Sequence, residues 1–157
     1  DYVFRLGQEK NLKIIFTGKA SEKDRDAEII FYKNYIRNSN FKIFPLNFKE
    51  YSGYVNIAKS KLVIGFCSTI LREAFIFKKK VLACNFTGHK DIIFPDDGIC
   101  NLNQDSSYDE FKDRVLTILN MTNDEYYKKL HKGVNYIINT QINPQKFIKG
   151  RVKEILI

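Results

Sequence analysis

A small, polar corner at Cys67-Ser68-Thr69 is the part of this chain best suited to bind an anion. It follows the apolar run Leu62–Phe66 and precedes an amphipathic segment, Ile70–Phe75, whose apolar residues recur at helical spacing. We therefore predict a strand, a tight turn and a helix that begins at this corner. Free backbone N–H groups and the positive end of the helix dipole would meet there, and both favour a phosphate group.

The elements that must position this corner alternate along the chain. Strands are predicted at Leu12–Thr17, Phe41–Leu46, Lys61–Phe66, Val81–Cys84 and Ile99–Cys100. Helices are predicted at Glu22–Asn38 with Ser21 as cap, at Glu50–Ser60, after Thr69, from Ser107 through its capping box with Glu110, at Asp124–Asn139 with Asn123 as cap, and at Pro144–Ile157. Helical spacing places Ala27, Ile30, Phe31 and Tyr35 of the first helix, and Tyr51, Val55 and Ala58 of the second, toward the core.

Strands separated by helices of this length imply right-handed crossovers and a parallel sheet. The expected fold class is therefore α/β, an open parallel sheet flanked by helices, with further helices at the C-terminus. Ligands bind such sheets outside the carboxyl ends of the strands. The segments expected to face a ligand are Gly18-Lys19-Ala20, Leu46-Asn47, Cys67-Ser68-Thr69 and Asn85–His89.

Length and composition favour a single globular domain spanning residues 1–157. Hydrophobic residues make up 44% of the 157 residues, enough for one packed core. The chain begins at Asp1 without a methionine, which leaves open that it is a fragment of a larger, two-domain enzyme. The apolar runs all fall short of the ~18 residues needed to cross a bilayer.

The net charge of +8 is compatible with polyanions, anionic membrane surfaces or phosphorylated ligands. The lysines are spread along the chain, which favours a solubilising surface over a dedicated polyanion site.

Three widely spaced cysteines, Cys67, Cys84 and Cys100, form neither a disulfide framework nor a metal pattern, and a reducing compartment fits best. The sequence also lacks a P-loop, a G-x-G-x-x-G dinucleotide motif and a G-x-S-x-G elbow.

The order of these features resembles the C-terminal, donor-binding half of a GT-B glycosyltransferase, over roughly residues 10–120. The resemblance is carried by the strand ending in Gly18-Lys19, the corner Ser68-Thr69, the pair Glu73-Ala74, the lysine-initiated strand at Lys80-Val81, the loop Thr87-Gly88 and the turn Pro95–Gly98. The local sequences STILREA and NFTG are also similar to those of bacterial surface-carbohydrate transferases.

The resemblance implies a role for each matching residue. The backbone N–H groups of Ser68, Thr69 and Ile70 would face the donor diphosphate, with the hydroxyls of Ser68 and Thr69 as extra donors. Glu73 would accept hydrogen bonds from ribose hydroxyls, and Lys19 would offset phosphate charge as the leaving group departs. Leu46 and Asn47 would contact the base, while Gly88 and His89 would lie near the donor sugar.

The same resemblance implies a nucleotide sugar as substrate, with neither metal nor cofactor. The acceptor site and the general base would come from a missing N-terminal domain, so catalytic residues stay unknown and the chain alone should bind the donor without turnover. We expect a cytoplasmic location, including peripheral association with the inner face of the membrane, and no nucleic acid. Many GT-B enzymes carry a second glutamate where this chain has Phe66, Cys67 and Ser68, which puts recognition of the donor sugar in doubt.

Plainer interpretations stand beside these. Ser68 and Thr69 are typical N-cap residues, and Arg72 is expected on the outer face. Glu73 could be a solvated helix residue or could pair with Lys78 or another nearby lysine. Two other functions also stay open. One is the half-domain of a nucleotide-sugar epimerase or polyol-phosphate transferase. The other is a non-catalytic basic module that binds RNA or lipid, for which Tyr126-Tyr127-Lys128-Lys129 is the best local support.

Overall fold

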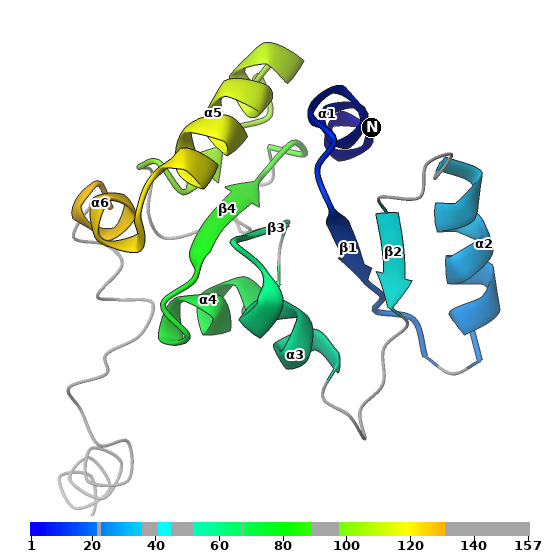
Figure 1. Ribbon diagram of the computed structural model, residues 1–157. Helices are drawn as coiled ribbons and strands as arrows, with labels where there is room; N and C mark the ends of the chain where they lie inside the picture. The colour runs from blue at the N-terminus through cyan, green and yellow to red at the C-terminus, as the bar shows by residue number, and fades with distance from the viewer. Residues whose placement is uncertain (22, 36–40, 45–51, 67, 89–97, 131–157) are drawn as a thin grey trace, which may run out of the picture.

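Parallel strands alternate with helices through the part of the chain that the structure describes (Figure 1). The structure is a computed structural model, and it describes residues 1–21, 23–35, 41–44, 52–66, 68–88 and 98–130. The helices are α1 (Tyr2–Lys10), α2 (Arg25–Tyr35), α3 (Ser52–Lys59), α4 (Thr69–Ile76), α5 (Tyr108–Asn120) and α6 (Asn123–Lys128). The strands are β1 (Ile14–Thr17), β2 (Phe41–Phe44), β3 (Leu62–Gly65), β4 (Lys80–Cys84) and β5 (Asn101–Leu102). The predicted α/β class with parallel strands flanked by helices is confirmed.

The described strands pair in two groups. Strand β1 pairs with β2, with Ile14 opposite Phe41, while β3, β4 and β5 form a second sheet in that order, with Leu62 opposite Lys80. All of these pairings are parallel. Figure 1 shows the two groups beside each other, with β1 and β2 pointing downward and β4 pointing upward. The strands were expected in one open sheet, and among the described residues they are divided between two.

The main core surrounds β4, whose five residues are all buried. A strand buried on both faces needs a continuous apolar run, which Val81–Cys84 supplies. Helices α4 and α5 and the short α6 cover it with Leu71, Ala74, Phe75, Phe111, Val115, Ile118 and Tyr126. The Tyr126 hydroxyl donates to the carbonyl oxygen of Val81 and accepts from its N–H at 3.1 Å. It therefore satisfies both backbone groups of Val81, which lies before the residues of β4 that pair with β5.

Stacked aromatic rings form the core of the β1–β2 pair. The ring of Phe16 stacks on Phe4 of α1 at 4.9 Å and on Tyr32 of α2 at 5.2 Å between centroids. Phe4 also stacks on Phe41 of β2 at 5.5 Å. Offset stacking of this kind adds to the free energy of burying the rings. The aromatic residues therefore hold α1 and α2 against this smaller sheet.

Helices α2 and α3 each turn a different face toward the core than predicted, so the described residues that were expected to be buried are exposed. In α2, Ile30 and Phe31 are 59% and 56% exposed, because the stack of Tyr32 on Phe16 sets the rotation of the helix. Ala27 is exposed as well, and the side chain of Tyr35 lies outside the described residues.

In α3, Val55 and Ala58 are exposed, while Gly53, Asn56 and Ile57 are buried. Tyr51 lies outside the described residues. The buried face of this helix contains a glycine and an asparagine, so the positions of its apolar residues in the sequence did not identify that face.

Several boundaries differ from the predictions. The capping box of Ser107 and Glu110 is confirmed for α5, but the N-cap of α6 is Thr122, which forms its own capping box with Glu125, and not Asn123. Helix α2 begins at Arg25, because the hydroxyl of Ser21 donates to Asp24 in the turn before it. The last strand lies at Asn101–Leu102, two residues beyond its predicted position.

Helix α1, for which the sequence analysis assigned no element, links the two sheets. A Cβ on Gly7 would lie 2.6 Å from Ile14 and 2.7 Å from Phe41, so only glycine lets α1 approach β1 and β2 this closely. On its other side the ring of Tyr2 packs edge-on against Tyr108 of α5 at 5.5 Å. None of the described helices combines the length and apolar character needed to cross a membrane.

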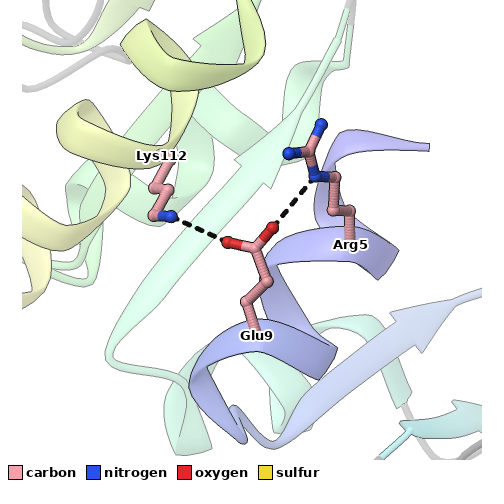
Figure 2. Close-up of polar contacts among 3 residues, drawn as sticks. All are labelled: Arg5, Glu9 and Lys112. Carbon is pink, nitrogen blue, oxygen red and sulfur yellow. Dashed lines mark hydrogen bonds and ion pairs between the residues drawn. The ribbon is translucent and has the colours of Figure 1, made fainter.

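Ion pairs reinforce the contact between α1 and α5 (Figure 2). The Glu9 carboxylate accepts from Arg5 at 2.9 Å, one turn earlier, and from Lys112 of α5 at 2.8 Å. The Arg5 guanidinium also lies 3.8 Å from the centre of the Tyr108 ring. Hydrogen bonds, first from Lys112 and then from Arg5, lower the pKa of Glu9 from its ordinary 4.5 to about 2.

Lysines cap the C-terminal ends of two helices. The Nζ of Lys80, at the start of β4, donates to the carbonyl oxygens of Ile118 at 2.6 Å and Met121 at 2.7 Å, at the end of α5. The neighbouring Lys79 donates to the carbonyl oxygens of Ala58 at 2.6 Å and Ser60 at 3.2 Å, at the end of α3. These carbonyl groups have no intrahelical partner and carry the negative end of the helix dipole, so an ammonium group stabilises them. Burial lowers the pKa of Lys80.

We predict that Lys80→Met destabilises the fold. The methionine fills the same space, but the buried carbonyl oxygens lose their donor, which typically costs about 2 kcal/mol. Urea unfolding should show a lower free energy of unfolding. The exposed neighbour Lys78 provides the control, because Lys78→Met should change that free energy by less than about 0.5 kcal/mol. Equal effects of the two substitutions would contradict the capping role.

Glu9 should make stability depend on acid pH. Because its folded pKa is lowered to about 2, its contribution is fully present above pH 4.5 and is lost as the pH falls toward 2. Glu9→Gln should therefore lower the melting temperature at pH 7, and the difference from the parent chain should shrink steadily below pH 4.5. Melting curves by circular dichroism at pH 7, 5, 4 and 3 test this. A difference that stays constant across the series would disprove the assignment.

Candidate functional site

The predicted corner opens onto the N-terminus of α4. Ser68 occupies the N-cap position with extended backbone (φ −141°, ψ 133°), yet its side chain makes no capping hydrogen bond. Its carbonyl oxygen accepts from the N–H of Leu71 at 3.1 Å, which closes the first turn. Ser68 and Thr69 are both exposed. Helices α5 and α6 instead satisfy their N-termini with capping boxes. Both hydroxyls of the corner thus face solvent at the positive end of a helix.

Helix α3 joins this corner to the end of β1. A Cβ added to Gly53 would lie 3.0 Å from Ile70 in the first turn of α4 and 3.9 Å from Thr17 at the end of β1. The amide of Asn56, which is only 7% exposed, donates to the Thr17 hydroxyl at 3.0 Å. The carboxyl end of β1 and the N-terminus of α4 therefore meet across α3, although β1 and β3 belong to different sheets.

Glu73, one turn into α4, is half-buried and bonded to an aromatic residue. Its carboxylate accepts a hydrogen bond from the Tyr54 hydroxyl of α3, and this bond, followed by the carboxylate charge, raises the pKa of Tyr54. The alternative pairing with Lys78 is not formed among the described contacts, since that ammonium lies 5.5 Å from the centre of the Tyr127 ring. Tyr54 orients Glu73 on the side of α4 that faces α3.

The turn after β1 holds an anion supplied by the chain itself. The backbone N–H of Lys19 donates to Glu28 of α2 at 2.9 Å, and that of Ala20 donates to both oxygens of the same carboxylate at 3.3 Å. The side chain of Lys19 is exposed. The backbone of this turn is therefore already satisfied, and the ammonium of Lys19 is the group that a ligand could use.

Gly88 lies in the turn after β4, where the chain requires glycine. Its φ of +65° favours glycine, and a Cβ there would lie 1.6 Å from the side-chain oxygen of Gln104, which follows β5. The hydroxyl of Thr87 donates to Asn85 at 3.1 Å and orders the same turn. The predicted Gly loop is thus packed against the loop that follows β5.

The remaining predicted site residues lie outside the described residues. They are Leu46, Asn47, His89 and Cys67, and their roles stay predictions. Arg72 is exposed, as predicted.

In the segment Tyr126–Lys129 the first ring is fully buried and the two lysines are exposed, so this segment lacks the paired exposed rings on which nucleic-acid bases would stack.

Sequence reasoning missed the contribution of α3. Gly53, Tyr54 and Asn56 contact the predicted site but were not among its residues. The usable signal was Asn56, a polar residue at helical spacing from Gly53 and next to Ile57 on the buried face. A polar residue on such a face needs a partner, and this one finds it on another element.

Groups for metal or thiol chemistry are scarce in the described residues. They hold no cluster of three His, Cys, Asp or Glu side chains that could bind a metal ion. Cys84 and Cys100 are free and buried, and burial raises the pKa of the Cys84 thiol to about 12. That thiol therefore stays protonated and unreactive at neutral pH.

Comparison with known proteins identifies a family that this chain matches. A family model described as "putative O-antigen biosynthesis protein" matches residues 1–153. The searches of curated proteins and of solved structures found no match. The matched range covers almost the whole chain, including every residue of the candidate site.

Asn56→Ala should loosen the junction between β1 and α3. The substitution removes the buried amide that donates to the Thr17 hydroxyl, so we expect a loss of about 1 kcal/mol in the free energy of unfolding. Asn120→Ala, at the exposed end of α5, is the control and should change it by less than about 0.5 kcal/mol. Denaturant titration distinguishes the two, and an equal loss in both variants would count against the junction.

Proposed function

The chain belongs to this O-antigen biosynthesis family, and on that premise we propose that it binds the nucleotide diphosphate of an activated sugar donor. The proposed activity is glycosyl transfer in the synthesis of a surface polysaccharide or glycoconjugate. Under this proposal the chain is the donor-binding half of a metal-independent, GT-B type glycosyltransferase.

The start of α4 is the observation that carries the proposal. Parallel strand β3 leads into it, the Ser68 side chain leaves it uncapped, and the hydroxyls of Ser68 and Thr69 are exposed there. In the proposed complex, the N–H groups of Ser68, Thr69 and Ile70 donate to the diphosphate, and the hydroxyls of Ser68 and Thr69 are additional donors. A helix N-terminus binds phosphate through such free N–H groups and through its dipole.

Glu73 is the proposed acceptor for the ribose hydroxyls. It follows Thr69 by four residues, so the two side chains lie on the same face of α4, about one turn apart. That separation is about 6 Å along the axis, which suits a ribose attached to a phosphate at the N-terminus. The Tyr54 hydroxyl lies within hydrogen-bonding reach of this carboxylate.

The remaining proposed contacts involve other parts of the donor. The Lys19 ammonium would offset the charge that develops on the departing diphosphate. Leu46 and Asn47 would contact the base, and Gly88 and His89 the donor sugar. The acceptor site and the general base would belong to a further domain, so the chain alone binds the donor but transfers nothing. The proposed location is cytoplasmic.

Thermal-shift measurements with UDP, GDP, CDP, CMP and ADP test the proposal. We expect one nucleotide to stabilise the fold. At a hundredfold excess over its Kd it should add about 2.7 kcal/mol, equivalent to a rise of about 5–10 °C in the melting temperature. Glu73→Gln and Ser68→Ala should each raise the Kd about tenfold, because each removes a hydrogen bond to the ligand.

Matched substitutions outside the site make the result specific. Asp113→Asn on the exposed face of α5 and Ser106→Ala before that helix should leave the Kd unchanged. Melting without nucleotide checks that every variant folds. If all nucleotides stabilise the chain equally, or if the control variants weaken binding as much as Glu73→Gln does, the proposal fails.

A further inference from the structure

Exposed apolar side chains gather where α4 ends, beside a group of lysines. Ile76 and Phe77 are 52% and 51% exposed, and the ring of Tyr54 on α3, itself 42% exposed, packs edge-on against Phe77 at 6.0 Å. We name this region the α4-end surface. It comprises Tyr54, Ile76 and Phe77 with the exposed lysines Lys59, Lys61, Lys78, Lys128 and Lys129.

Direct contacts bring these segments together. The ammonium of Lys79 reaches the carbonyl oxygens of Ala58 and Ser60, which holds the end of α3 beside the end of α4. On the other side, the Tyr127 hydroxyl of α6 donates to the carbonyl oxygen of Lys79 at 2.9 Å. The side chain of Asn123 likewise donates to the carbonyl oxygen of Lys78 at 3.1 Å. The ends of α3, α4 and α6, where these exposed lysines occur, are therefore held next to one another.

We propose that the α4-end surface binds the surface of an anionic lipid bilayer. This proposal does not rest on the donor site proposed above, although Tyr54 contributes to both regions. Ile76 and Phe77 would enter the interface between headgroups and acyl chains, while the lysines contact anionic headgroups. Peripheral proteins combine apolar burial with electrostatic attraction in this way.

The charge balance distinguishes this surface from the other exposed apolar face. The α4-end surface carries five lysines, and its neighbouring acids are Asp124 and Glu125 of α6 and Glu73 beside Tyr54. The Glu125 carboxylate accepts from the N–H and hydroxyl of Thr122 at 2.8 and 2.9 Å. Around Ile30 and Phe31 of α2, the charges of Lys23, Arg25 and Lys33 are balanced by Asp24, Asp26 and Glu28. An anionic membrane attracts the first surface and not the second.

The apolar chemistry favours a membrane over a nucleic acid. Single-stranded nucleic acids bind basic surfaces by stacking bases on exposed rings. Ile76 is as exposed as Phe77 but offers no ring for stacking, whereas both side chains gain by burial among acyl chains. The test below includes RNA so that this alternative has its own outcome.

The absence of tryptophan from the chain permits a direct test. Phe77→Trp places a single tryptophan in the α4-end surface, and Phe31→Trp places one at a similarly exposed position on α2. Each variant is titrated with vesicles of phosphatidylcholine alone, with vesicles containing one quarter phosphatidylglycerol, and with polyuridylate RNA. Melting curves confirm that both variants fold.

We expect the emission of Trp at position 77 to shift to the blue with the anionic vesicles, and that at position 31 to stay unchanged. Lys78→Glu in the Phe77→Trp background should weaken vesicle binding about ten- to thirty-fold, since it removes one attraction to the surface and adds a repulsion. Lys33→Glu in the same background should have no such effect. No shift at position 77, equal shifts at both positions, or a response to RNA alone would each overturn the proposal.

Discussion

The buried ammonium of Lys80 is the contact on which most of the fold depends. It lies at the first residue of the most buried strand and binds the carbonyl oxygens that end α5, so one side chain fixes the strand and the helix to each other. Helix α5 in turn holds α1 through Lys112, and the loop before β5 through the bonds from Arg114 to Gly98 and Ile99. A lysine in this position donates to backbone carbonyl groups that would otherwise be unsatisfied.

The division of the strands into two sheets assigns the joining role to helices. Helix α1 meets β1 and β2 through Gly7 and reaches α5 through Tyr2, while α3 joins the end of β1 to the start of α4. The candidate site therefore depends on side-chain packing where a continuous sheet would use a hydrogen-bonded ladder.

Much of this architecture was predictable from local patterns, and the errors in the helix faces and in α1 share one physical cause. Strands with continuous apolar runs, the helix after Ser68 and the capping box at Ser107 follow from propensity and capping, which act within a few residues. The faces of α2 and α3 and the presence of α1 were not predictable in this way. They depend on contacts between distant residues, such as Tyr32 with Phe16 and Asn56 with Thr17. The lysine run at 78–80 was visible in the sequence, but its two capping partners lie about 20 and 40 residues away in the chain.

The carboxylate of Glu28 under the backbone of Lys19 and Ala20 has a consequence for recognition. Because this tethered acid orders the turn before any ligand arrives, the entropy lost in forming the turn belongs to folding and not to association. An incoming anion would find the Lys19 side chain carried on a preorganised support. The same acid would repel an anion that came too close to the turn, so it limits approach to the outer side of the loop. Glu28 would in this way determine how closely an anionic ligand can approach the end of β1.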